Sequence, residues 1–232
     1  MTRLTFVLLL FVAAQPTLIG KQPNRVVNKK RNTTTNAKAS AYANSKRSVR
    51  PRSSVTYESG LSLPIAPPSA VRGREHYDPR GSGNPLVITR GPIRSKKISK
   101  DFTVDEYAQS GKREFEISRI DPDLVACNQR IRDSVGRPVL IDSGYRSFTY
   151  NLEVYKRMHK KATRSPHTSG WATDIKIRNM SGQRIAEIAL DVCGPNIGIG
   201  IGVNYAHIDV RGYFAIWKYD GVSNSQVAEV KQ

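Results

Sequence analysis

Two side chains that could bind a metal ion lie on either side of a glycine in the stretch Ser165–Ile177. His167 lies in a polar, turn-forming segment, and Asp174 begins a short alternating run that predicts a β-strand. Gly170 lies between them and allows the backbone to fold back, so the imidazole and the carboxylate can approach each other. Either the two are ordinary polar residues before a strand or they are two ligands of one metal.

A third candidate ligand lies in the segment Tyr205–Arg211. If this segment is a strand, alternation places His207, Asp209 and Arg211 on one face. Two histidines, one carboxylate and an open fourth position form the ligand set of a catalytic zinc site, whereas structural zinc sites usually have four protein ligands. The sequence therefore predicts one zinc ion held by His207, the earlier histidine and Asp174. A lone strand histidine can also be purely structural.

Helices and short strands alternate around these residues. Asp121 followed by proline is a helix start, Gly136 is a stop, and a Gly-Pro pair at 194–195 stops a later helix. We expect helices over 121–133, 151–161 and 181–193, and strands over 139–142, 174–177, 199–203, 206–210 and 215–219. This order predicts an α+β fold in which helices pack on a small, mainly antiparallel sheet, preceded by a disordered basic segment.

The first part of the chain has a different character. The apolar run Leu4–Ala14 follows an arginine and is too short to cross a bilayer, which predicts a signal peptide over 1–20 and a secreted, extracytoplasmic protein. Cleavage is expected after Ala14 or nearer Gly20, and an uncleaved anchor is the alternative. Residues 21–97 lack apolar periodicity, so they are predicted to be disordered, with the zinc-binding domain over 98–222 and a tail over 223–232.

The 232-residue chain carries a formal net charge of +18, which favours encounter with polyanions. Its basic clusters lack interleaved aromatic residues, so no specific nucleic-acid partner is expected, and the basic segment is predicted to bind an anionic cell-wall polymer. We expect a monomer. The two cysteines, Cys127 and Cys193, are not spaced as metal ligands and could form one disulfide in an exported protein.

Between residues 98 and 218 the sequence resembles the zinc D-alanyl-D-alanine carboxypeptidases and related murein endopeptidases. The resemblance rests on three blocks, which are DSGYRS from Asp142, SPHTSGWATD from Ser165 and GIGVNYAHIDVR from Gly200. It implies that the two histidines and Asp174 bind zinc, and that Arg146 stabilises the oxyanion that develops on the substrate. A fixed guanidinium beside a metal-bound carbonyl would add positive charge where negative charge grows. Residues of the same blocks are assigned to substrate binding, namely Ser143, Tyr145 and Ser165.

The general base departs from the family pattern. Many relatives place an acidic residue or a histidine two or three positions before the third ligand, where this chain has Tyr205 and Asn204. Asp209 shares the predicted face of His207, so it could accept the proton of the zinc-bound water or orient His207 by a hydrogen bond. In another register Asp209 is the ligand and His207 the base.

These observations predict an exported zinc metallopeptidase that hydrolyses peptide bonds in peptidoglycan stem peptides or cross-bridges. Its bond specificity could be that of a carboxypeptidase or of an endopeptidase. A non-catalytic, zinc-containing protein that binds the wall or another polymer is the alternative, and the absence of an upstream base favours it. A secreted nucleic-acid-binding protein is supported by charge alone.

Overall fold

The computed structural model describes residues 53–71, 73–161 and 164–230, which belong to one compact unit spanning Val49–Gln232. The predicted signal peptide and residues 21–52 of the basic segment lie outside the described residues. Within the described part of the chain, no helix combines the length and hydropathy needed to cross a membrane.

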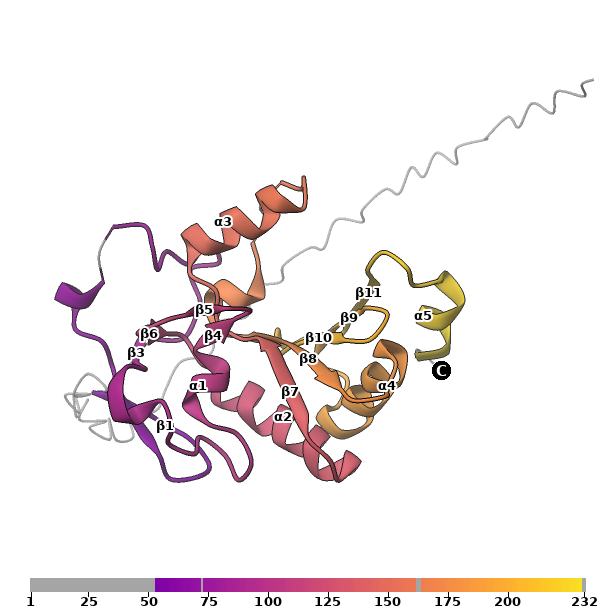
Figure 1. Cartoon of the computed structure of the whole chain (residues 1–232), viewed down its shortest axis with the longest axis horizontal. Coiled ribbons are helices and arrows are strands. Elements are labelled where there is room, and N and C mark those ends of the chain that lie inside the picture. The colour runs from indigo at the N-terminus through magenta and orange to yellow at the C-terminus, as the bar shows by residue number, and fades with distance from the viewer. Residues whose placement is uncertain (1–52, 72, 162–163, 231–232) are drawn as a thin grey trace, which may run out of the picture. The chain divides into compact units, whose positions relative to one another are not determined.

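A seven-stranded sheet forms the centre of this unit, in the order β11-β9-β10-β8-β7-β4-β5 (Figure 1). All neighbouring strands run antiparallel except β11 and β9, which are parallel. The α+β prediction is therefore confirmed. The strands are β4 (Gln109–Ser110), β5 (Arg113–Glu114), β7 (Val139–Ser143), β8 (Ala172–Ile177), β9 (Gly198–Ile201), β10 (Ala206–Asp209) and β11 (Ala215–Lys218).

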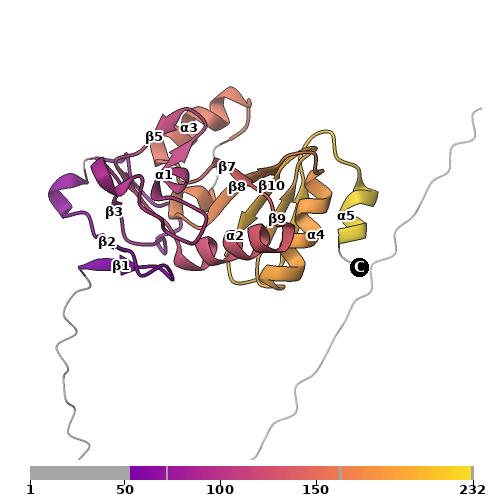
Figure 2. The ribbon, with the colours of Figure 1, turned by 60° about the horizontal axis from the view of Figure 1, so that its bottom comes forward.

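Two helices, α2 (Pro122–Val135) and α4 (Gly182–Cys193), lie side by side below the sheet (Figure 2). Helix α2 begins where the Asp121 carboxylate accepts a backbone N–H, and it ends at Gly136 in the left-handed conformation. The Ser181 hydroxyl caps α4 in the same way. Both starts agree with the sequence prediction.

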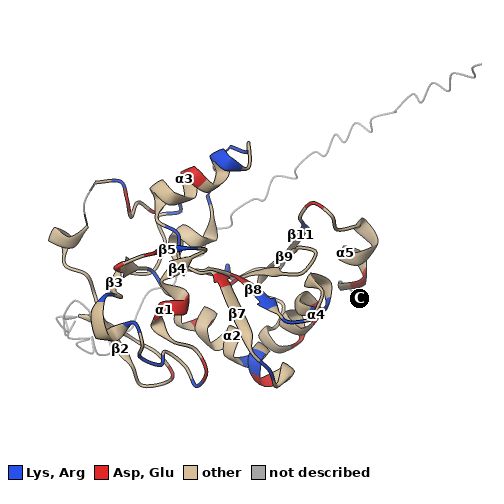
Figure 3. Cartoon of the chain, in the orientation of Figure 1, with Lys and Arg blue, Asp and Glu red and all other residues tan. Residues whose placement is uncertain are grey.

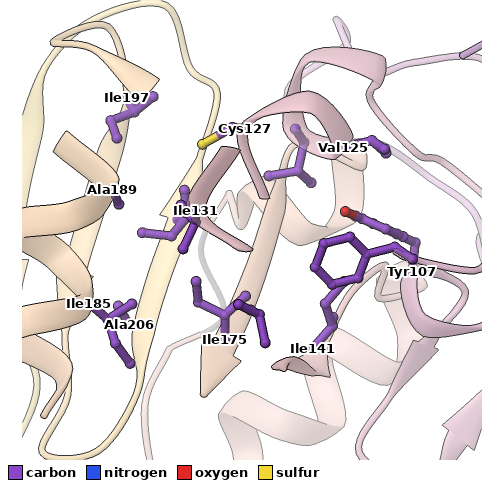
Figure 4. Close-up of a cluster of buried hydrophobic side chains, with 14 of the residues drawn as sticks. Tyr107, Val125, Cys127, Ile131, Ile141, Ile175, Ile185, Ala189, Ile197 and Ala206 are labelled. Carbon is purple, nitrogen blue, oxygen red and sulfur yellow. The ribbon is translucent and has the colours of Figure 1, made fainter. Parts of the chain in front are cut away.

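The hydrophobic core fills the space between these helices and one face of the sheet (Figure 4). Alternate strand residues supply the sheet side, including Ile175 of β8 and Ile208 of β10, both 0% exposed. A disulfide joins Cys127 of α2 to Cys193 of α4, so the two helices are also linked covalently. The opposite sheet face is thereby left for polar side chains.

Residues before 98 differ from the predicted disorder wherever the structure describes them. They include strands β1 (Ser54–Thr56), β2 (Ser62–Pro64) and β3 (Val87–Ile88), and Leu63 is fully buried in the main core. Two- and three-residue strands carry no readable periodicity, which explains why the pattern failed here. The remaining elements of this region are η1 (Pro68–Ala70) and η2 (Gly91–Ile93). The short elements α1 (Val104–Tyr107) and β6 (Ile117–Ser118) follow after residue 98.

Helix α3 and the C-terminal segment also differ from the predictions. Helix α3 (Phe148–Arg157) starts three residues earlier than expected because the Ser147 hydroxyl caps it, and it ends four residues earlier. The predicted C-terminal tail contains helix α5 (Asn224–Val230), which packs on α4 and β11 and buries Val230. The compact unit therefore extends beyond 98–222 at both ends.

Candidate metal centre

His167, Asp174 and His207 converge on the sheet face opposite the core. His167 lies in the short 3-10 helix η3 (Pro166–Ser169), whereas Asp174 and His207 face each other as register partners on β8 and β10. His167 Nε2 lies 3.2 Å from His207 Nδ1 and 3.3 Å from Asp174 Oδ1, and His207 Nδ1 lies 2.9 Å from the same Oδ1. The structure thus brings together all three residues predicted from the sequence.

A backbone carbonyl sets the orientation of His167. Its Nδ1 lies 2.7 Å from the Gly144 carbonyl oxygen, and because a carbonyl can only accept, this nitrogen carries the proton. Nε2 therefore presents its lone pair to the cluster. Gly144 lies directly against the backbone of Tyr107, and only glycine fits this position because a β-carbon would lie 2.3 Å from the Tyr107 carbonyl oxygen. Burial, together with the charge of Arg146, lowers the pKa of His167 to about 4 and keeps the ring neutral.

A carboxylate sets the orientation of His207. Its Nε2 donates to Asp209 Oδ2 at 3.1 Å, which leaves Nδ1 free to face Asp174. Arg211 donates twice to Asp209, at 2.5 and 2.6 Å. Burial of Asp209 opposes its ionisation, but the hydrogen bonds from Arg211 and His207 lower its pKa to about 2. Asp209 is therefore an ionised, fully buried group on the side of the imidazole away from the cluster.

Arg146 connects Asp174 to the rest of the site. Its guanidinium donates to Asp174 Oδ2 at 2.5 Å, while its Nε donates to the hydroxyl oxygen of Ser143 at 2.9 Å. The hydroxyl of Ser110 on β4 lies 3.3 Å from the same Nε. Burial opposes ionisation of Asp174, but His167 and Arg146 hold its pKa well below the ordinary value. Asp174 is thus a carboxylate with Oδ1 directed at the two histidines.

This donor set fits a zinc ion. Ligand atoms at 2.0–2.1 Å from a tetrahedral zinc ion are roughly 3.3 Å from one another. The three distances between the donor atoms, 2.9, 3.2 and 3.3 Å, are close to that value. Both imidazoles donate their other N–H to a protein acceptor, as zinc-binding histidines usually do. The three residues could therefore hold one metal ion and leave a further coordination position to water or substrate.

Glycines on the neighbouring strand keep space for these groups. Gly198 lies opposite Asp209, and a β-carbon there would be 2.5 Å from Asp209 Oδ2. Gly200 lies opposite His207, and a β-carbon there would be 2.7 Å from Trp217 Nε1. The alternating glycines of β9 therefore clear the polar face of the sheet, where Trp217 packs 5.2 Å from the His207 ring.

The cluster opens into a cleft of about 670 Å³. Ser165 lines the cleft, whereas Ser143 lies behind Arg146 and Tyr145 is buried, with its hydroxyl on His76. Burial raises the pKa of the cleft residue Tyr205 to about 12. Sequence reasoning assigned no role to several residues that the structure places at the site, namely Arg80, Ser110, Lys160, Arg164, Trp217 and Tyr219. Of these, only Trp217 carried a signal, because it alternates with the core-packed Ile216 in the predicted strand.

Comparisons with known proteins agree with this geometry. Residues 83–209, which span the three site residues, match the family model described as peptidase M15. The peptidoglycan L,D-endopeptidase MepK of Escherichia coli strain K12 and its counterpart in Shigella flexneri are each 34% identical over 99 residues. That segment is 42% of this chain and 54% of each relative, so the match spans about half the length of these relatives. No solved structure matches the chain significantly. Because the family match covers more than half of its residues, this chain belongs to the peptidase M15 family.

Proposed function

We propose that this protein is a zinc-dependent peptidase that hydrolyses peptide bonds in peptidoglycan, with the ion held by His167, Asp174 and His207. The observation that carries the proposal is the convergence of three correctly oriented donor atoms within 4.8 Å of one another beside a cleft. The relatives are named as peptidoglycan L,D-endopeptidases, which favours an endopeptidase over a carboxypeptidase.

The roles of the surrounding residues follow from their contacts. Bound zinc would polarise the substrate carbonyl and lower the pKa of a bound water. Arg146 lies against Asp174 and lines the cleft, so its guanidinium can donate to an oxygen that becomes negative during hydrolysis. Ser143 and Ser110 hold this guanidinium from behind.

We assign Asp209 to positioning rather than to proton transfer. Its two oxygens already accept from His207 Nε2 and from Arg211, and it is fully buried. A carboxylate bonded to the outer nitrogen of a metal-binding histidine fixes the tautomer and raises the basicity of the ligand. Of the two roles that the sequence left open for Asp209, its contacts favour orientation of His207.

A zinc-containing protein that binds peptidoglycan without cleaving it is the second candidate. Two cleft residues, Asn204 and Tyr205, occupy the positions where a general base is expected. Asn204 cannot accept a proton usefully and the pKa of Tyr205 is about 12, which favours a protein without catalytic activity. Both candidates require the same metal site, so metal content alone does not separate them.

The deciding experiment is digestion of purified peptidoglycan by the zinc-loaded full chain, followed by mass spectrometry of the products. An endopeptidase converts cross-linked dimers into monomers, whereas a carboxypeptidase removes one terminal residue without changing the degree of cross-linking. His207→Ala should bind less zinc and release no product. If the parent protein contains one zinc ion per chain and leaves the peptidoglycan intact, the binding protein is the correct interpretation.

We also propose that the protein is exported and that its basic segment binds an anionic wall polymer. The disulfide between α2 and α4 is typical of an oxidising compartment. Because residues from 53 onward take part in the fold, the segment to delete is 21–52. Loss of retention on an anionic polymer at low salt, with zinc binding unchanged, is the expected result. Unchanged retention would assign the interaction to the folded unit.

A further inference from the structure

A loop that lies mostly before the family-matched residues forms part of the cleft. This loop, Glu75–Asn84, is called the strap below, and the family match starts only at its residue 83. At one end the Glu75 carbonyl accepts from the N–H of Phe148, the first residue of α3, at 2.7 Å. At the other end the Asn84 N–H donates to the carbonyl of Ser169 in η3 at 3.2 Å. The strap therefore connects the helix that borders the cleft to the turn that carries His167.

The carboxylate of Asp78 folds the middle of the strap and fixes it to η3. It accepts from the backbone N–H groups of Arg80 at 3.0 Å and Gly83 at 2.6 Å, and from the Ser169 hydroxyl at 2.7 Å. A β-carbon at Gly83 would lie 2.9 Å from the Ser169 Cα, so the two segments are in direct contact. The position of Arg80 is therefore set relative to the metal-site residues.

Arg80 extends from the strap into the cleft. One guanidinium nitrogen donates to the Arg164 carbonyl at 3.0 Å, and the group lies over the Trp171 ring at 5.6 Å from its centroid. Its Nε is buried and has no hydrogen-bond partner among the residues that the structure describes. No carboxylate of the described residues lies within ion-pair distance of this guanidinium. Donor capacity is thus left over beside the site.

The cations of the cleft divide into two groups. Those on the sheet side are paired, since Arg146 contacts Asp174, and Lys176 contacts Asp142 at 3.0 Å. Those on the opposite wall come from the strap and from the segment after α3, whose C-terminal end is basic in Figure 3. This second group consists of Arg80, Lys160 and Arg164. None of these three side chains forms an ion pair with a carboxylate of the described residues.

We propose that this wall, centred on Arg80, binds a free carboxylate of the peptide substrate beside the bond that is cleaved. The inference rests on the proposed peptidase function and specifies its substrate class as an acidic peptide. A planar guanidinium stacked on an aromatic ring is already oriented for a two-point bond to a carboxylate. Lys160 and Arg164 add charge, so an amide at the same place in the substrate is recognised less well.

Two matched substrates and three variants test this assignment. The substrates are one peptidoglycan fragment with its free carboxylates and the same fragment with those groups converted to amides. The variants are Arg80→Gln, Arg80→Lys and the control Arg74→Gln, because Arg74 is an exposed residue directly before the strap that does not line the cleft. Zinc content and thermal unfolding temperature are measured for each variant to show that the strap and the metal site are intact.

We expect the parent to prefer the acidic fragment by about tenfold in kcat/KM, the lower end for a hydrogen bond to a charged group. Arg80→Gln should lose most of this preference while cleaving the amidated fragment as the parent does. Arg80→Lys should keep part of the preference, and Arg74→Gln all of it. Equal losses on both fragments would show that Arg80 only supports the strap, and an unchanged preference would overturn the proposal.

Binding measurements separate failure of this inference from failure of the proposed function. If the parent cleaves neither fragment, the peptidase assignment fails, but calorimetry on the zinc-loaded chain still compares the affinities of the two fragments. Weaker binding of the acidic fragment to Arg80→Gln, with the amidated fragment unaffected, would support the carboxylate site in a binding protein. Equal affinities of the parent for both fragments would refute it.

Discussion

Replacing Asp209 by asparagine tests whether this residue positions His207 or transfers a proton. In the structure its carboxylate accepts from His207 Nε2 at 3.1 Å and twice from Arg211. An asparagine oxygen in the place of Oδ2 can still accept from the imidazole and from one nitrogen of Arg211, but the amide N–H groups would then face Arg211 Nε. The variant therefore removes the charge behind His207 and creates donor–donor repulsion without leaving a cavity.

The expected loss lies in metal affinity. Removing the hydrogen-bond partner of a metal ligand typically lowers affinity about 10- to 100-fold, or about 1.4–2.7 kcal/mol. The unpaired Arg211 adds a cost in folding free energy, because breaking a buried ion pair by removing one partner costs about 3–5 kcal/mol. Retention of an acceptor at position 209 should reduce that figure. We expect weaker zinc binding and lower stability, with turnover largely restored when zinc is in excess.

Chelator competition measures the zinc dissociation constant, and kcat is measured at zinc concentrations above the dissociation constants of both proteins. Asp142→Asn is the matched control, since Asp142 lines the same cleft and its side chain pairs with Lys176 without touching a metal-site residue. This control should bind zinc as the parent does. If Asp209→Asn keeps the parental zinc affinity and loses about 10²- to 10⁴-fold in kcat at saturating zinc, Asp209 is the general base and our assignment is refuted.

Three further predictions concern the framework. Gly144→Ala should lower the free energy of unfolding by about 1–3 kcal/mol and weaken zinc binding, because its β-carbon would collide with the Tyr107 backbone. Urea unfolding measures the first effect and chelator competition the second, and parental values in both would show that the loop adapts. Serine at Cys127 and Cys193 removes a cross-link between positions 66 residues apart and should cost up to about 4 kcal/mol in urea unfolding; no loss would mean that packing alone holds the two helices. Burial of Asp78 opposes its ionisation, but hydrogen bonds from the Ser169 hydroxyl and from strap amides hold its pKa below the ordinary value of 3.8. The stability that ionised Asp78 contributes is therefore present above pH 3.8 and is lost as the pH falls through the lower pKa of the folded state. The stability difference between the parent and Asp78→Asn should shrink over that acidic range in pH-dependent unfolding, and a pH-independent difference would contradict this linkage.

The elements around the site were predictable because local rules and tertiary packing agree there. Asp121 and Gly136 bound α2 as the capping rules require. Alternation along β10 separates Ile208, which lies in the core, from His207 on the polar face. Boundaries were less secure in α3. The Ser147 hydroxyl caps this helix, but Asn151 is its only buried residue, so no contact with the core marks its first turn.

The three residues of the proposed metal site were predictable as residue types, but their orientations were not. Nothing in the spacing of His207 and Asp209 specifies which imidazole nitrogen meets the carboxylate, and that choice decides whether Asp209 positions a ligand or acts on water. The strap was missed for a different reason. Its contribution comes from Asp78 and Gly83, which contact η3 across a large sequence separation and form no periodic pattern.

The fold and the metal centre depend on the same strand register. His207 lies directly opposite Asp174, and the residues that flank this pair, Ile208 and Ile175, lie in the core on the other face of the sheet. A slip of one residue between the two strands would expose one isoleucine set and bury the opposing polar set, so the hydrophobic core strongly disfavours it. The free energy that the core gains by fixing this register therefore also holds the two proposed ligands on the strands in place. Only His167, on η3, needs separate support, and it receives that support from the Gly144 carbonyl and from the strap.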